Sequence, residues 1–101
     1  MLTIQEKTID LTKINPEDLF IKKAGGDTLY IQVEGEASVS FTGKNSELET
    51  YVNLPVVNMS TFAKEENISK EGFYMCIIGG LDQIQMTSSG SGKMHWKVMG
   101  E

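Results

Sequence analysis

Apolar and polar residues alternate with a period of two along much of this chain, and this rhythm is what most constrains its fold. The clearest examples are residues 28–34 and 37–43, where every second residue is apolar. A period of two places the apolar side chains on one face of a β-strand. No segment keeps helical spacing over several turns. The pattern therefore predicts an all-β protein.

Residues 28–34 and 37–43 are joined by the short connection Glu34-Gly35-Glu36. Glycine is typical of tight turns between strands. We therefore predict that the two segments form a hairpin with one apolar face. Its apolar residues are Leu29, Ile31, Val33, Ala37, Val39 and Phe41.

The last third of the chain contains three strand-length segments, at residues 72–78, 83–87 and 93–99. They are separated by Gly79-Gly80-Leu81-Asp82 and by the glycine- and serine-rich residues 88–92. Such residues supply the positive φ angles and local hydrogen bonds of turns. This order predicts an antiparallel meander.

The whole chain, residues 1–101, is expected to form a single β-sandwich domain, with residues 1–27 as an N-terminal arm or edge strand. The spacing predicts about seven or eight short strands in an antiparallel sandwich of jelly-roll or immunoglobulin-like type. Asn15-Pro16 begins one turn of helix or a β-turn before a short strand. Pro55 cannot donate to a central ladder, so it marks an edge or a strand start.

Charge and composition exclude several kinds of partner. The 101 residues carry a formal net charge of −5, and the nine basic residues are scattered, which argues against nucleic acid. No apolar stretch is long enough to cross a membrane. Residues 1–6 lack the basic start and apolar run of a signal peptide. We therefore expect the protein to be made in a cytoplasm.

Residues with reactive or ligand-binding side chains form no recognisable constellation. Cys76 is the only cysteine and lies in the most apolar segment, which favours a buried, inert thiol. His95 lacks partners at metal-ligand spacing and is expected to face solvent. Trp96 shares an apolar face with Met94 and Val98, which favours a core position over a sugar-stacking one. Tyr30 is the better candidate for an exposed aromatic residue.

Acidic pairs offer no calcium or catalytic motif. No calcium-loop sequence surrounds them, so solvated turns and charged edges explain them better. We therefore predict a protein that is not an enzyme, with no catalytic, cofactor-binding or metal-binding residues and no cofactor. The pairs are Glu34 with Glu36, Glu47 with Glu49, and Glu65 with Glu66.

Both faces of residues 73–78 are apolar. Tyr74, Cys76 and Ile78 point one way in a strand, and the remaining three residues point the other way. A sandwich buries one face of each strand, so something else must cover the second. The cover is either the N-terminal arm of the same chain or a neighbouring copy. The residues of this second face are Phe73, Met75 and Ile77.

The order of these motifs resembles the small β-sandwich modules of tailed-phage and prophage virions, found in head fibres, capsid decoration proteins and tail or baseplate accessories. The resemblance covers residues 28–99, and its motifs are patterns of turns and strands. It departs from the family at residues 44–48, where the family usually carries an Asp-Gly-x-x-Trp sequence. The segments that carry it are residues 28–43, Leu54-Pro55-Val56, residues 68–74, Gly80-Leu81-Asp82-Gln83-Ile84 and Ser88-Ser89-Gly90-Ser91-Gly92.

The resemblance implies two functions of different classes. One is a structural virion component that contacts copies of itself, as a homo-oligomer such as a trimer, and larger virion proteins. The other is a carbohydrate-binding module for adhesion to a host surface. An exposed row of aromatic residues would favour carbohydrate, and apolar surfaces buried between subunits would favour assembly.

Overall fold

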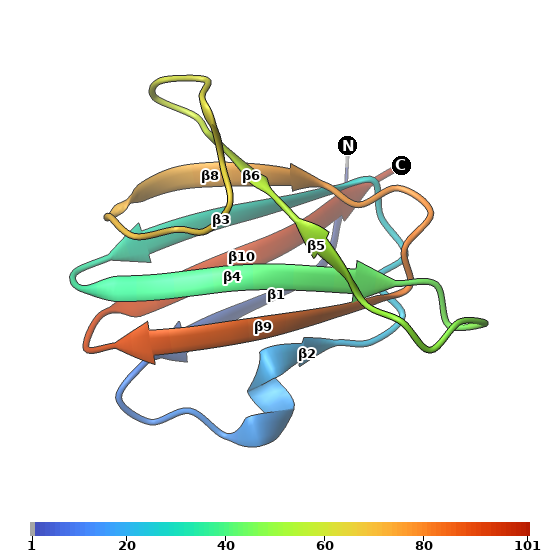
Figure 1. The fold of residues 1–101 in the computed structure, drawn as a ribbon, viewed down its shortest axis with the longest axis horizontal. Helices are drawn as coiled ribbons and strands as arrows, with labels where there is room; N and C mark the ends of the chain where they lie inside the picture. Colours follow the sequence, from blue (N-terminus) through green and yellow to red (C-terminus); the bar gives the residue numbers. More distant parts are fainter. Residues whose placement is uncertain (1) are drawn as a thin grey trace.

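Two antiparallel β-sheets face each other in the computed structural model, which describes residues 2–101 (Figure 1). The six-stranded sheet has the order β1 (Leu2–Asp10), β10 (Lys93–Gly100), β3 (Thr28–Glu34), β8 (Gly72–Ile77), β6 (Val56–Asn58) and β7 (Lys64–Glu65). The four-stranded sheet has the order β2 (Phe20–Ile21), β9 (Gln83–Gly90), β4 (Ala37–Lys44) and β5 (Val52–Leu54). The predicted all-β antiparallel sandwich is confirmed. Residues 2–101 hold ten strands, because β2 and β7 are very short and Pro55 separates β5 from β6.

The core lies between the sheets and follows the alternation of the sequence. Trp96 is only 4% exposed and lies there with Met94 and Val98, so its predicted core position is confirmed. Burying one large apolar side chain contributes roughly 1.5–3 kcal/mol before conformational entropy is counted. The six apolar residues predicted from residues 28–43 are all buried: Leu29, Ile31, Val33, Ala37, Val39 and Phe41.

The predicted hairpin between residues 28–34 and 37–43 is wrong. Strand β3 pairs with β10 and β8, whereas β4 pairs with β5 and β9 in the other sheet. Gly35, with a φ of 75°, lies in the turn that carries the chain from one sheet to the other. Both apolar faces still reach the core, because they cover it from opposite sides.

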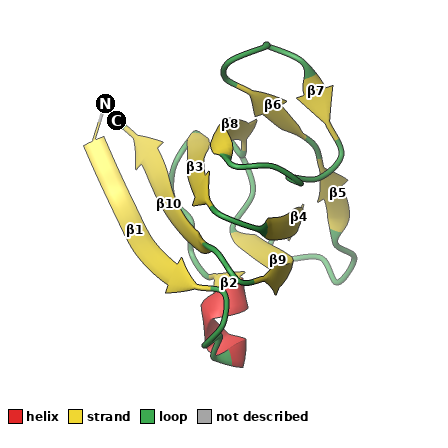
Figure 2. Cartoon of the chain, turned by 90° about the vertical axis from the view of Figure 1, so that its left-hand side faces the viewer, coloured by secondary structure: helices red, strands yellow, loops and turns green. Residues whose placement is uncertain are grey.

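The predicted meander of the last third is also wrong, because its consecutive strands belong to different sheets. Strands β8 and β10 belong to the six-stranded sheet and β9 to the four-stranded sheet, so each turn crosses the sandwich (Figure 2). The turn after β9 lies against the turn after β3, since Gly92 N donates to Glu36 O at 2.8 Å. A Cβ atom on Gly92 would lie 2.0 Å from Glu34 O, so the contact requires glycine.

Pro55 marks another crossing between the layers. Strand β5 is the edge of the four-stranded sheet, and β6, which follows Pro55 directly, pairs with β8 in the six-stranded sheet. Proline has no N–H to offer a ladder. The predicted edge or strand start at this position is therefore confirmed.

The N-terminal segment forms the edge of the six-stranded sheet. Strand β1 pairs with β10, and Gln5 Nε2 donates to the Lys23 carbonyl at 2.8 Å, which links this edge to the segment after β2. A 3-10 turn over Pro16–Leu19 precedes β2, which confirms the predicted turn and short strand. Lys7 forms an ion pair with Asp18 of this turn. Within residues 2–101, no helix has the length and apolar character needed to cross a bilayer.

Candidate functional site

The face of the six-stranded sheet that points away from the core carries the candidate site. We call it the outer face. Each strand contributes the residues that alternate with its buried ones, and antiparallel register brings them into rows across the sheet. One row runs through Glu6, Lys97, Tyr30, Met75 and Val57, from β1 to β6. The row begins with charged residues and ends with apolar ones.

Strand β8 supplies most of the apolar part. Its inward residues Tyr74 and Cys76 are buried, whereas Ile77 is 73% exposed and Phe73 is 42% exposed. Together with neighbours on β3 and β6, the outward residues form a continuous surface. We define the apolar patch as Tyr30, Val57, Phe73, Met75 and Ile77.

One of the two alternatives for covering this patch is wrong. The N-terminal arm does not lie over β8, because β1 pairs edge to edge with β10 and is separated from β8 by both β10 and β3. Backbone hydrogen bonding explains this outcome, since the ladder satisfies the N–H and C=O groups of β1 that point towards β10. Coverage by a neighbouring copy stays a prediction.

Two aromatic residues meet at the centre of the outer face. The ring centroids of Tyr30 and Phe73 lie 6.1 Å apart, and the ring planes are inclined by 45°. This spacing falls within the range of favourable aromatic pairs. The sequence predicted an outward Tyr30 beside Gln32, which is confirmed, but not its pairing with Phe73.

A shallow open hollow lies beside this pair. It has a volume of about 410 Å³. Its floor and walls combine aromatic rings with one carboxylate, one amide, one imidazole and one ammonium group, so it offers both apolar contact and hydrogen-bonding groups. The lining residues are Glu6, Tyr30, Gln32, Phe73, His95, Lys97 and Met99.

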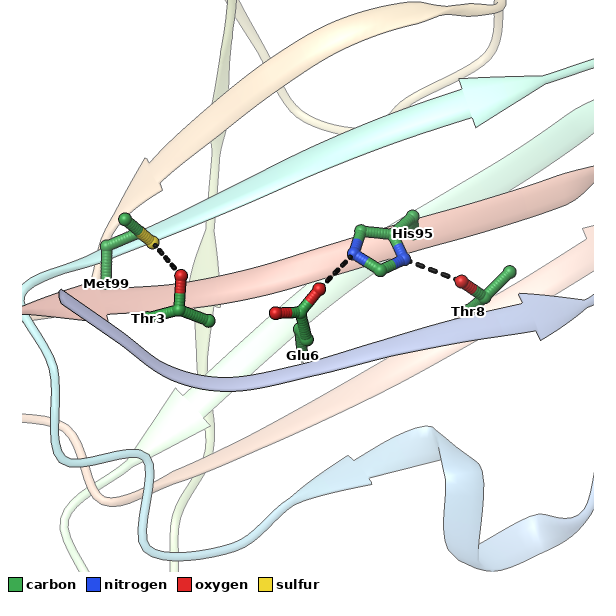
Figure 3. Close-up of polar contacts among 5 residues, drawn as sticks. All are labelled: Thr3, Glu6, Thr8, His95 and Met99. Atoms are coloured by element: carbon green, nitrogen blue, oxygen red, sulfur yellow. Dashed lines mark hydrogen bonds and ion pairs between the residues drawn. The ribbon is translucent and has the colours of Figure 1, made fainter.

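His95 is held between two residues of the edge strand (Figure 3). Its Nε2 lies 3.1 Å from Glu6 Oε1, and its Nδ1 lies 2.6 Å from Thr8 Oγ1. A carboxylate only accepts, so Nε2 carries the proton, and in neutral histidine Nδ1 accepts from the threonine hydroxyl. Thr3 Oγ1 donates to Met99 Sδ at 3.3 Å farther along the same pair of strands.

His95 lies on the predicted outward face but is half-buried by these contacts. Its neighbours Lys93 and Lys97 are exposed. Among residues 2–101, no three histidine, cysteine or acidic side chains gather into a group that could hold a metal ion. The pairing of His95 with Glu6 and Thr8 was missed because these residues lie at opposite ends of the chain. The only available signal was the alternation that places Glu6 and Thr8 on one face of β1.

Cys76 is buried, as predicted. Burial raises the pKa of its thiol to about 11. The thiolate is the reactive form of cysteine, so this side chain is a poor nucleophile at neutral pH.

The acidic pairs lie at turns and edges of the described chain, as predicted. Most of these residues are exposed. Glu65 is half-buried and its Oε2 accepts from Asn58 Nδ2 at 3.1 Å. Glu71, which belongs to none of the pairs, accepts from Gly35 N at 2.7 Å and so holds the turn after β3.

A second concavity lies where Pro55 carries the chain between the sheets. We call it the crossover groove. It has a volume of about 220 Å³ and opens beside the apolar patch. Apart from one lysine its lining is apolar: Leu54, Pro55, Val57, Lys64, Met75, Cys76 and Ile77.

The fold, in contrast to the sequence, has clear counterparts among known proteins. No family model matches the sequence, and no curated protein matches it. The fold is similar to the crystal structure of the SPBc2 prophage-derived protein YomS, with a TM-score of 0.66 and 14% identity over 97% of this chain and 96% of that one. It is also similar to the PBSX exported protein XepA, with a TM-score of 0.65 and 18% identity over 93% of this chain and 38% of that one. The chain therefore shares its β-sandwich fold with a prophage-derived protein and with part of a longer exported one.

Proposed function

We propose that this chain is a non-enzymatic structural component of a phage or prophage particle and that it acts through protein–protein contacts. The apolar patch is the contact surface. The observation that carries this proposal is the exposure of Phe73 and Ile77 on a regular sheet face. Exposed apolar patches with a polar border are typical of interaction sites.

The border of the patch supports specific rather than indiscriminate contact. Glu6, His95 and Lys97 lie on the β1 and β10 side, and Lys64 lies on the β7 side. Charged borders orient a partner and disfavour wrong ones, while the apolar centre supplies affinity. We expect the partners to be copies of this chain and larger virion proteins. The fold shared with the prophage-derived protein YomS supports the phage or prophage context.

Incorporation into particles tests this proposal. Particles are purified on a density gradient from the bacterium that encodes the chain, and mass spectrometry measures the copy number of the chain relative to the main shell protein. We expect a fixed ratio for the wild type and loss of the chain for Ile77→Asp. Thr87→Asp adds the same charge to an exposed strand position of the other sheet and serves as the matched control. Absence of the wild-type chain from particles would overturn the proposal.

A second candidate is carbohydrate binding in the hollow beside Tyr30 and Phe73. The observation that favours it is the aromatic pair next to Glu6, Gln32 and Lys97. Aromatic faces pack against the apolar face of a sugar ring, while polar side chains bond its hydroxyl groups.

A glycan array tests the second candidate directly. A saccharide that binds the wild type should lose binding to Tyr30→Ala and to Phe73→Ala. The matched control is Phe20→Ala, since Phe20 is a partly exposed aromatic residue on β2 of the other sheet. Binding that survives loss of either ring excludes the hollow as a carbohydrate site.

A further inference from the structure

Phe62 combines two properties that are unusual for a phenylalanine. Its side chain is 77% exposed, and its backbone has a φ of 60°. A left-handed backbone is unfavourable for any residue with a bulky side chain, and glycine or asparagine adopts it far more readily. An exposed aromatic ring in this conformation contributes little to the core. Such outliers concentrate at functional sites.

The loop that carries Phe62 is held by a set of hydrogen bonds. It joins β6 to β7 and extends beyond the two sheets (Figure 2). Asn58 Oδ1 accepts from Ser60 N at 2.9 Å, and Phe62 N donates to Asn58 O at 2.7 Å. Asn58 N in turn donates to Ala63 O at 2.9 Å. These hydrogen bonds fix the backbone from which the Phe62 side chain projects.

The crossover groove has the chemistry to receive such a ring. Leu54, Pro55, Val57, Met75 and Ile77 give it apolar walls. Phe62 does not fill the groove of its own chain, because its side chain remains largely exposed. The same molecule therefore carries an exposed phenylalanine and an apolar groove that this phenylalanine does not fill.

We propose that Phe62 of one copy inserts into the crossover groove of a second copy. This inference rests on the proposed function, because Val57, Met75 and Ile77 belong to both the groove and the apolar patch. It names the second copy as the partner and Phe62 as the anchor. Large aromatic residues seated in apolar pockets supply most of the affinity in protein interfaces.

Charge and geometry support a second copy as the occupant. Lys64 lines the groove, and Glu66 follows the Phe62 loop. Neither residue forms an ion pair within residues 2–101, so each is available to the opposite charge on another copy. The loop begins directly after β6, which lines the groove, and returns at Lys64 on its border. Ring and groove therefore belong to the same corner of the molecule, as a self-complementary contact between two copies requires.

Self-association of variants tests the inference. Sedimentation equilibrium is measured over micromolar to submillimolar concentrations for the wild type, Phe62→Gly and Ile77→Asp. We expect the wild type to associate. The association constant of both variants should be lower by a factor of about ten or more, as for loss of an interface anchor. Leu48→Ser is the matched control, because Leu48 is also an exposed apolar residue but lies in the loop between β4 and β5. It should associate like the wild type.

Two outcomes overturn the inference. One is a wild type that stays monomeric across the whole concentration range. The other is a Phe62→Gly variant that associates as strongly as Leu48→Ser. The proposed function is judged separately by particle incorporation. If the wild type is monomeric but still enters particles, the proposed function stands. The inference that a second copy occupies the groove then fails.

Discussion

Tyr30 and Phe73 are diagonal rather than direct neighbours on the outer face, because Gln32 is the residue that lies opposite Phe73. Their ring centroids are nevertheless only 6.1 Å apart. Diagonal pairs interact in sheets when the side chains are long enough to meet. The pair therefore links β3 to β8 on the solvent side, in addition to the core contacts that these strands share.

A double-mutant cycle measures this tie. We expect Tyr30→Ala and Phe73→Ala to show a coupling of about 0.5–1 kcal/mol in the free energy of unfolding, determined with urea. Tyr30→Ala combined with Phe20→Ala should be additive, since Phe20 lies on the other sheet. Additivity for the first pair as well would mean that the rings make no energetic contact.

Gly92 is required by the two turns that lie against each other. Gly92→Ala should lower the free energy of unfolding by roughly 1–3 kcal/mol, the usual cost of forcing an atom into packed structure. The added Cβ would lie 2.0 Å from Glu34 O. Gly79→Ala is the matched control, because its Cβ would come no closer than 3.9 Å to Asp27 Oδ1, and it should have little effect. Equal effects of the two changes would contradict the stacked turns.

Phe62→Gly should stabilise the monomer even though it weakens association. Relief of the left-handed backbone outweighs the added entropy of glycine in the unfolded chain, for a net gain of roughly 0.5–1 kcal/mol. The comparison is made by urea unfolding in the Ile77→Asp background and at low protein concentration, so that self-association contributes little. A loss of stability on removing the ring would show that Phe62 serves the fold of its own chain.

The Cys76 thiol should make the folded protein less stable at high pH. Burial raises its pKa from 9.0 to about 11, so between these values the folded state holds the proton and the unfolded state releases it. The state that binds more protons is disfavoured as pH rises, so stability falls across this window. Urea unfolding of the wild type and Cys76→Ala measures the difference, and Cys76→Ala should lack this component of the pH dependence. If the free energy of unfolding fell with pH equally steeply in both proteins, a buried thiol would be excluded.

Asp82 should contribute to stability at neutral pH and not in strong acid. Its carboxylate accepts from Ser46 N at 3.0 Å and from Ser46 Oγ at 2.8 Å, and these hydrogen bonds hold its pKa below 3.8. The contribution is present above that ordinary value and disappears as pH falls through the lowered pKa of the folded state. Asp82→Asn should therefore be less stable than the wild type at neutral pH, with the difference shrinking in acid. A difference that stays constant with pH would assign the effect to packing.

The faces of the strands could be predicted from the sequence, but their partners could not. Alternation in residues 28–34 and 37–43 identified the buried side of both segments correctly. It carries no information on which sheet a segment joins, because either sheet offers the same apolar core. A short connection such as Glu34-Gly35-Glu36 suits a hairpin and a crossing turn equally well. The pairing was therefore wrong while the buried residues were right.

The site was predictable only where it follows from a single strand. The outward position of Phe73, Met75 and Ile77 comes from the local alternation of β8. The contacts of His95 with Glu6 and Thr8 depend on the pairing of β1 with β10, which no local pattern reveals. The backbone of Phe62 depends on the hydrogen bonds of Asn58, and a phenylalanine in that loop gives no sign of its φ angle.

The interior position of β10 governs when this protein can fold. Residues 93–100 fill the place between β1 and β3, so until the ribosome has released them both neighbours expose open backbone edges. Among the strands of this sheet in residues 2–101, only β6 and β7 form a hairpin between consecutive strands. The rest of the sheet must wait for contacts between distant parts of the chain. Proteins built mainly from such contacts fold in about milliseconds to seconds. During synthesis, these two open edges are therefore the places where nascent chains can pair with one another.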